Sequence, residues 1–189
     1  MANDVSAGST TTTTIAGRLA LFVTLLAFGL GYTRVIDAVT PGDAVVLARY
    51  IGGISLFLVG LLAFRDRDTA SGTAFTSLGA LWFAWSLSAQ GQVAADAAGL
   101  FLALFAAVVL SLTLAGGDPL TQATYGLFLV SLVLLAVARF DGASGLAKVG
   151  GWFAVAAGAV AWYAATAALA HWPTALSRRA AGRGVTAAG

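Results

Sequence analysis

Long apolar stretches alternate along this chain with short polar or charged breaks. An α-helix needs about 20 mainly apolar residues to cross the hydrocarbon core of a bilayer, and six stretches approach that length. We therefore predict membrane-spanning helices at residues 16–32, 44–64, 73–87, 97–115, 120–138 and 149–170. Several of the breaks contain proline or glycine, which interrupt helices. The expected fold is an all-α integral membrane protein with six transmembrane helices per protomer.

The composition agrees with this fold class and excludes several functions. Of the 189 residues, 59% are hydrophobic and 10% charged, and the mean hydropathy is +0.90. A soluble domain carries about 25% charged residues. The chain has one histidine and neither cysteine nor glutamate, so we expect no metal centre, no cofactor and no enzyme active site. The net charge of +2 is too small, and the basic residues too scattered, to indicate nucleic-acid binding.

The distribution of basic residues predicts the orientation of the helices. With both termini cytoplasmic, the cytoplasmic side carries six arginines: Arg18, Arg65, Arg67, Arg178, Arg179 and Arg183. The outer side carries four cations and four acids: Arg34, Arg49, Arg139 and Lys148 with Asp37, Asp43, Asp96 and Asp141. A neutral outer face argues against a mouth that attracts anions by net charge.

The ends of the chain differ from its middle. Residues 1–14 are polar and of low complexity, and we expect a disordered cytoplasmic tail there. Residues 15–172 form the predicted six-helix transmembrane domain, and residues 173–189 a basic cytoplasmic tail. The expected location is the cytoplasmic membrane of the cell.

Hydroxyl side chains gather on one face of the third predicted helix. Thr73, Thr76 and Ser77 share this face with Ala80 at helical spacing. Hydroxyls in membrane helices serve either as hydrogen-bonding filler between helices or as donors along a pathway, and periodicity leaves both open. In the pathway interpretation these three hydroxyls donate to a carboxylate, and Thr24 faces them from the first helix. An ionised carboxylate is costly in hydrocarbon, and co-transport of a proton removes its charge.

Small residues recur every three or four positions in the sixth predicted helix, at Gly151, Ala154, Gly158, Ala161 and Ala165. This spacing permits the close approach of a second helix. The sequence leaves open whether that helix belongs to the same protomer or to a neighbouring subunit.

The stretch from Gly52 to Trp82, GGISLFLVGLLAFRDRDTASGTAFTSLGALW, resembles the second and third helices of the acetate uptake transporter (YaaH-like) family. The matching pieces are Gly52-Gly53-Ile54, Gly60-Leu61-Leu62 and Thr73-Ala74-Phe75-Thr76-Ser77, with Gly79 and Trp82. The resemblance implies six helices per protomer, assembly as a homo-oligomer (a hexamer), and a monocarboxylate pathway through each protomer.

The chain also departs from the family pattern. The Asn-Pro motif that opens the family's first helix is replaced here by TTTIAGR at residues 12–18, in which only Gly17 is kept. The family's aromatic gate has a tyrosine where this chain has Leu78. The other gate positions fall near Leu21 or Phe22 and on Leu132. The resemblance therefore implies an apolar constriction formed by Leu21, Phe22, Leu78 and Leu132.

These observations predict a membrane transporter or channel for acetate or a similar small monocarboxylate, coupled to protons, with lipid and the carboxylate as partners. A urea or amide channel is an alternative, because such channels share a six-helix hexameric plan. A membrane protein that keeps only the scaffold and does not transport is a third, favoured by the loss of the Asn-Pro motif and of the gate tyrosine. A pathway blocked by bulky side chains throughout would favour this third alternative.

Overall fold

The computed structural model describes residues 12–36, 39–88 and 94–172, and all regular structure in these residues is helical. Helix α1 comprises Thr12–Thr33, α4 Thr69–Ser88, α5 Ala95–Leu114, α6 Pro119–Asp141 and α7 Ser144–Leu169. The second span consists of three consecutive segments, α2 (Pro41–Leu47), η1 (Ala48–Ser55) and α3 (Leu56–Arg65). The prediction of an all-α protein with six long helices is confirmed. Residues 1–11 and 173–189 of the expected tails lie outside the described residues, and α1 begins at Thr12.

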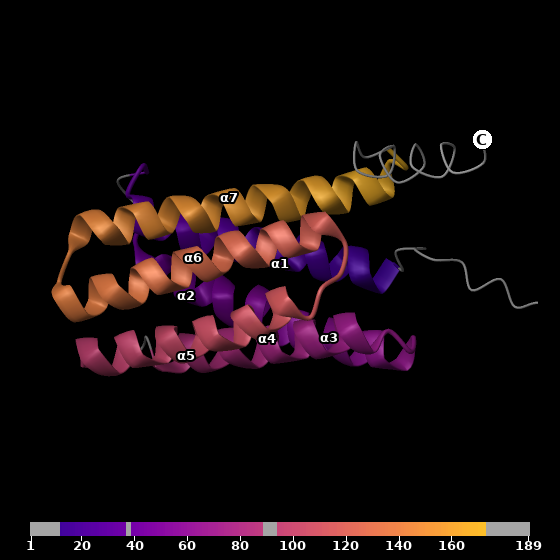
Figure 1. The fold of residues 1–189 in the computed structure, drawn as a ribbon, viewed down its shortest axis with the longest axis horizontal. Helices are drawn as coiled ribbons and strands as arrows, with labels where there is room; N and C mark the ends of the chain where they lie inside the picture. The colour runs from indigo at the N-terminus through magenta and orange to yellow at the C-terminus, as the bar shows by residue number, and fades with distance from the viewer. Residues whose placement is uncertain (1–11, 37–38, 89–93, 173–189) are drawn as a thin grey trace, which may run out of the picture.

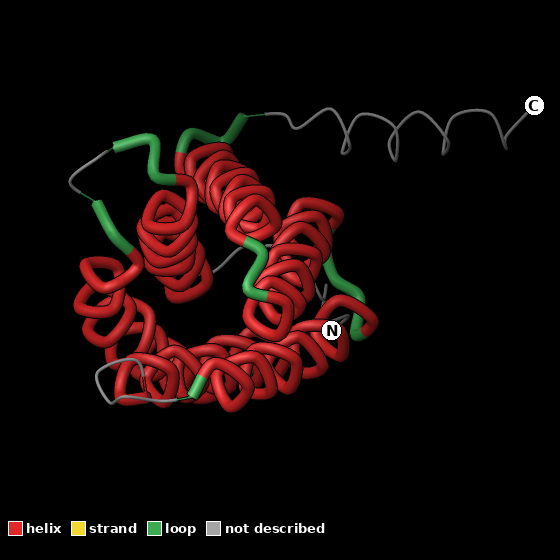
Figure 2. The backbone as a smooth tube through the Cα atoms, turned by 90° about the vertical axis from the view of Figure 1, so that its left-hand side faces the viewer, coloured by secondary structure: helices red, strands yellow, loops and turns green. Residues whose placement is uncertain are grey.

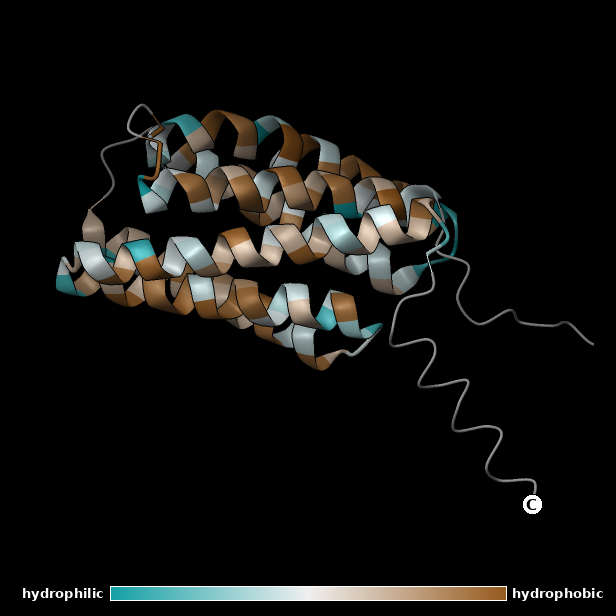
Figure 3. Cartoon of the chain, turned by 90° about the horizontal axis from the view of Figure 1, so that it is seen from above, coloured by the Kyte–Doolittle hydropathy of each residue, from teal (hydrophilic) through white to brown (hydrophobic). Residues whose placement is uncertain are grey.

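The helices have the length and composition of membrane spans. Within the described residues, five are long and apolar enough to cross a bilayer: α1, the continuous segment Pro41–Arg65, α5, α6 and α7. Helix α4 is of similar length, 20 residues, but carries several hydroxyl side chains and glycines. Hydrophobic residues fill the middle of the helices, and hydrophilic residues gather mainly at their ends (Figure 3). The chain is a multi-pass membrane protein.

Successive helices run in opposite directions along the bundle (Figure 1). The beginning of α1, the α3–α4 turn, the α5–α6 loop and the end of α7 therefore lie together, and we call this the terminal end. The end of α1, the beginning of α2, the beginning of α5 and the α6–α7 turn lie at the other end, which we call the distal end. Viewed along the bundle, the helices stand around one centre (Figure 2). Helix α7 packs between α1 and α6, and α6 contacts α5.

Glycines bring α1 and α7 into close contact. A Cβ atom at Gly29 would lie 2.6 Å from the carbonyl oxygen of Gly151, and one at Gly151 would lie 2.9 Å from the carbonyl oxygen of Gly29. The small residues of α7 follow the same contact: Ala154 is fully buried, and Gly158 lies against the backbone of Phe22. The small-residue face of α7 therefore packs on α1 within the protomer.

The second span contains an eight-residue π-helix, η1, which the sequence analysis does not predict. Gly52 and Gly53 lie inside it and allow two other helices to approach. A Cβ at Gly52 would lie 2.5 Å from Cγ2 of Thr24 and 3.1 Å from Cγ of Trp82, and one at Gly53 would lie 3.0 Å from Cβ of Phe83. π-Helical segments are rare in proteins, and those that occur often lie at functional sites. Here the π-helix packs the second span closely against α1 and α4, at the level of the central aromatic residues.

Candidate functional site

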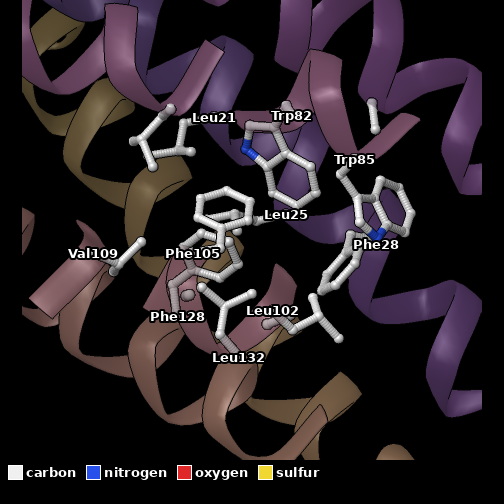
Figure 4. Close-up of a cluster of buried hydrophobic side chains, with 14 of the residues drawn as sticks. Leu21, Leu25, Phe28, Trp82, Trp85, Leu102, Phe105, Val109, Phe128 and Leu132 are labelled. Atoms are coloured by element: carbon white, nitrogen blue, oxygen red, sulfur yellow. The ribbon is translucent and has the colours of Figure 1, made fainter. Parts of the chain in front are cut away.

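Four aromatic rings from four helices meet in the centre of the bundle: Phe28 of α1, Trp82 of α4, Phe105 of α5 and Phe128 of α6 (Figure 4). Trp82 stacks on Phe128 with the ring centroids 5.5 Å apart, and its ring meets Phe28 and Phe105 edge-on at 5.1 and 5.4 Å. None of the four side chains is more than 1% exposed. We call these four rings, with the adjoining Leu21 and Leu132, the aromatic plug.

A cavity of about 450 Å³ opens at the terminal end, and we call it the terminal vestibule. Hydroxyl groups from α1, α4 and α6 line it, among them Thr14, Thr73 and Thr121. Its wall also includes Leu21, so the aromatic plug forms its inner end. This vestibule therefore carries hydroxyl groups in a wall that is otherwise mainly apolar.

One ion pair lies in the terminal vestibule. Nη2 of Arg18 is 2.5 Å from Oδ2 of Asp118 and 3.1 Å from the hydroxyl of Thr121, to which it also donates. Asp118 caps the N-terminus of α6 by accepting from the backbone N–H groups of Leu120 and Thr121. Burial raises the pKa of Asp118, but hydrogen bonds from Thr121 and the charge of Arg18 outweigh it, so the pKa lies below its ordinary value. The carboxylate therefore stays ionised and offsets the charge of Arg18.

A second cavity, of about 420 Å³, opens at the distal end, and we call it the distal vestibule. Its wall includes three cationic side chains, Arg34, Arg139 and Lys148, and no acidic residue is among the described residues that line it. Nη2 of Arg139 donates to the hydroxyl of Tyr32 at 3.2 Å, and its guanidinium carbon lies 6.0 Å from the centroid of that ring. Tyr32 in turn meets Phe28 of the aromatic plug edge-on at 5.0 Å. The distal vestibule is therefore cationic and reaches the other side of the plug.

The structure places the four predicted pathway hydroxyls in different surroundings. Thr73 lines the terminal vestibule. Thr24 is 1% exposed beside Gly52 and Trp82, and its hydroxyl donates to the carbonyl of Ala20 at 2.8 Å. Thr76 lies against Gly60 of α3, where a Cβ on that glycine would be 2.3 Å from its hydroxyl oxygen. Ser77 is half-buried and outside the walls of both vestibules.

Three of the four predicted constriction residues lie in one hydrophobic core with the aromatic rings. Leu21, Leu78 and Leu132 are at most 2% exposed and belong to this core. Phe22 is half-buried, and its backbone carbonyl faces Gly158 of α7. Leu21, Leu78 and Leu132 thus belong to the same buried core, whereas Phe22 lies at the contact between α1 and α7.

Several residues of the site are missed by sequence reasoning. Arg18 and Asp118 are 100 positions apart in the chain, so no local sequence pattern predicts that they form an ion pair. The four rings of the plug are spread over four helices, and only Trp82 lies in the stretch that resembles a known family. Within the described residues, no group of three histidine, cysteine or acidic residues is placed to hold a metal ion.

Comparison with known proteins relates this arrangement to other chains. The glyoxylate pathway regulator of Yarrowia lipolytica is 30% identical in an alignment of length 169 that covers 82% of this chain and 62% of that protein. The chain thus spans less than two thirds of that relative's length. The solved structure of the bacterial acetate channel SatP superposes with a TM-score of 0.75 and 23% identity, covering 84% of this chain and 92% of the other. Residues 5–176 match the GPR1/FUN34/yaaH family, and the chain belongs to this family.

Proposed function

We propose that the protein is a channel or transporter for acetate or a similar small monocarboxylate, coupled to protons, in the cytoplasmic membrane. The observation that carries this proposal is the pair of vestibules at opposite ends of one bundle, separated by the aromatic plug. Residues of α1, α5, α6 and α7 line both vestibules, so the two cavities lie along the same group of helices. A solute that crosses the bundle between them has to pass the plug.

The charges of the site favour an anionic solute that becomes neutral on the way. The three cations of the distal vestibule attract a carboxylate. The rings of the plug and its two leucines contain no ionisable side chain, and an ion in such surroundings costs many kcal/mol. A protonated carboxylic acid avoids this cost, which supports movement of the proton together with the carboxylate.

The relatives support the same solute class. The structural relative SatP is an acetate channel, and its fold covers most of this chain. We also propose a homo-oligomer, a hexamer, in agreement with the resemblance stated for residues 52–82, and both termini in the cytoplasm. Native mass spectrometry of the purified protein in detergent tests the subunit number, and a monomer as the sole species would contradict it.

Transport in reconstituted vesicles tests the function. The purified protein is placed in proteoliposomes, and uptake of radiolabelled acetate is measured with and without an inward proton gradient. We expect saturable uptake that the gradient accelerates, that an uncoupler reduces and that other short carboxylates inhibit. Uptake of urea at a rate that does not change when the proton gradient is collapsed would favour the urea or amide channel instead.

The same assay tests the interpretation that the chain does not transport. That interpretation expects bulky side chains along the whole path, whereas here they fill the middle of the bundle and cavities of about 450 and 420 Å³ open on either side. Folded protein with no flux of acetate, lactate or succinate would contradict the proposed function.

A further inference from the structure

The indole nitrogen of Trp82 is a buried hydrogen-bond donor without an acceptor. The side chain is 1% exposed, and no described residue accepts a hydrogen bond from its Nε1. Buried tryptophan N–H groups usually have a partner, and leaving one unmade is costly. An unmade hydrogen bond in the middle of a well-packed core therefore needs an explanation.

The ring cannot turn to find an acceptor. Phe128 stacks on one face of the indole, and Phe28 and Phe105 contact the indole edge-on. The backbone of Gly52 is so close to the ring that an added Cβ would lie 3.1 Å from Cγ of Trp82. The N–H direction is fixed by the ring, unlike that of a hydroxyl such as Thr76, which rotates about its C–O bond. The packing thus holds the donor in one direction.

That direction is toward the solute path. In Figure 4 the nitrogen lies on the edge of the Trp82 ring that is turned toward Leu21. Leu21 belongs both to the buried core and to the wall of the terminal vestibule. The other side chains of the plug, Phe28, Phe105, Phe128, Leu21 and Leu132, are hydrocarbon and offer no hydrogen bond.

We infer that the N–H of Trp82 donates a hydrogen bond to a carboxyl oxygen of the solute as it crosses the aromatic plug. The inference rests on the proposed function and adds a residue that determines specificity. The neutral N–H can donate to a carboxyl oxygen in either protonation state of the solute, and it offers nothing to a cation that carries only donors. The plug thereby selects small molecules with an exposed acceptor oxygen without holding a permanent charge.

The test removes the donor and keeps the shape. Trp82 is replaced by β-(3-benzothienyl)alanine, in which sulfur stands where the N–H was, and the same replacement at Trp85 is the matched control on the same helix. We expect acetate uptake to fall roughly tenfold in the Trp82 variant and less than twofold in the Trp85 variant, because a buried hydrogen bond to the solute is lost at position 82 alone. Elution as a single species in size-exclusion chromatography verifies the fold of both.

A second readout reports binding rather than flux. In ¹⁵N-labelled protein in nanodiscs, the indole ¹H–¹⁵N signal of Trp82 is assigned by its loss in Trp82→Phe. We expect acetate to shift this signal saturably and to leave that of the exposed Trp162 in place. Wild-type flux with no shift, and with equal flux in the Trp82 variant, would overturn the inference and leave the proposed function standing. Absence of both wild-type flux and shift would overturn the two together.

Discussion

Neutralising the cations of the distal vestibule should lower carboxylate uptake by an amount that the structure allows us to work out. A sphere of the cavity's volume, 420 Å³, has a radius of about 5 Å, so a centred carboxylate lies about 6 Å from each charge. At the dielectric constant of water, two unit charges at that distance attract by about 0.7 kcal/mol, which is roughly a threefold gain in local concentration. Replacing Arg139 by glutamine should therefore lower uptake at limiting acetate about threefold, and replacing Arg34, Arg139 and Lys148 together about 30-fold.

Salt and a matched charge change make this prediction specific. At 1 M salt the Debye length is about 3 Å, so the wild type and the triple variant should transport at similar rates. Arg65→Gln removes one charge at the terminal end, outside both vestibules, and should leave uptake unchanged. Initial rates are measured in proteoliposomes over a range of acetate and salt concentrations. Equal rates for the wild type and the triple variant at low salt would refute an electrostatic role for this vestibule.

Three further changes test the packing and the terminal vestibule. Phe128→Ala should lower the free energy of unfolding by about 3–5 kcal/mol and speed acetate flux, and an unchanged melting temperature would contradict its place in the plug. Gly151→Leu should destabilise the bundle by about 2 kcal/mol or more because α1 cannot move away freely, whereas Gly145→Ala, with open space around it, should cost nothing in the same thermal assay. Asp118→Asn keeps a residue that caps α6 but frees Arg18, so the KM for acetate should fall about threefold, and a raised KM would contradict this.

The long helices could be predicted from the sequence because five of them are apolar over the length of a membrane span and α4 is nearly as long. The π-helix could not, since it depends on contacts between helices. Its segment Ala48–Ser55 has no unusual local sequence apart from Gly52 and Gly53, and those glycines matter only because Thr24, Trp82 and Phe83 of other helices lie against them. Such close approaches are set by the packing of the whole bundle.

The hydroxyl face of α4 shows what helical periodicity cannot predict, namely the surroundings of each side chain on a shared face. Spacing alone allowed either a packing face or a pathway face, and the structure gives neighbouring residues of this face different surroundings. Thr76 packs on Gly60 of α3, while Thr73, one turn earlier, lines the terminal vestibule. Helical spacing says which side chains share a direction, but the neighbouring helix and the depth along the bundle decide what each one meets.

The charges of the distal end illustrate the same point in electrostatics. Counted along the chain, cations and acids on this side cancel, and that count argued against a mouth that attracts anions. In the fold, Arg34, Arg139 and Lys148 line the vestibule, whereas Asp43 is engaged by the backbone N–H and hydroxyl of Thr40 at 2.8 and 2.7 Å, away from that wall. The potential that a solute meets depends most on the charges that line its cavity, since solvent and salt weaken the contribution of charges farther away. A face that is neutral in sum therefore contains a cationic vestibule, and the neutralisation of Arg139 tests that conclusion directly.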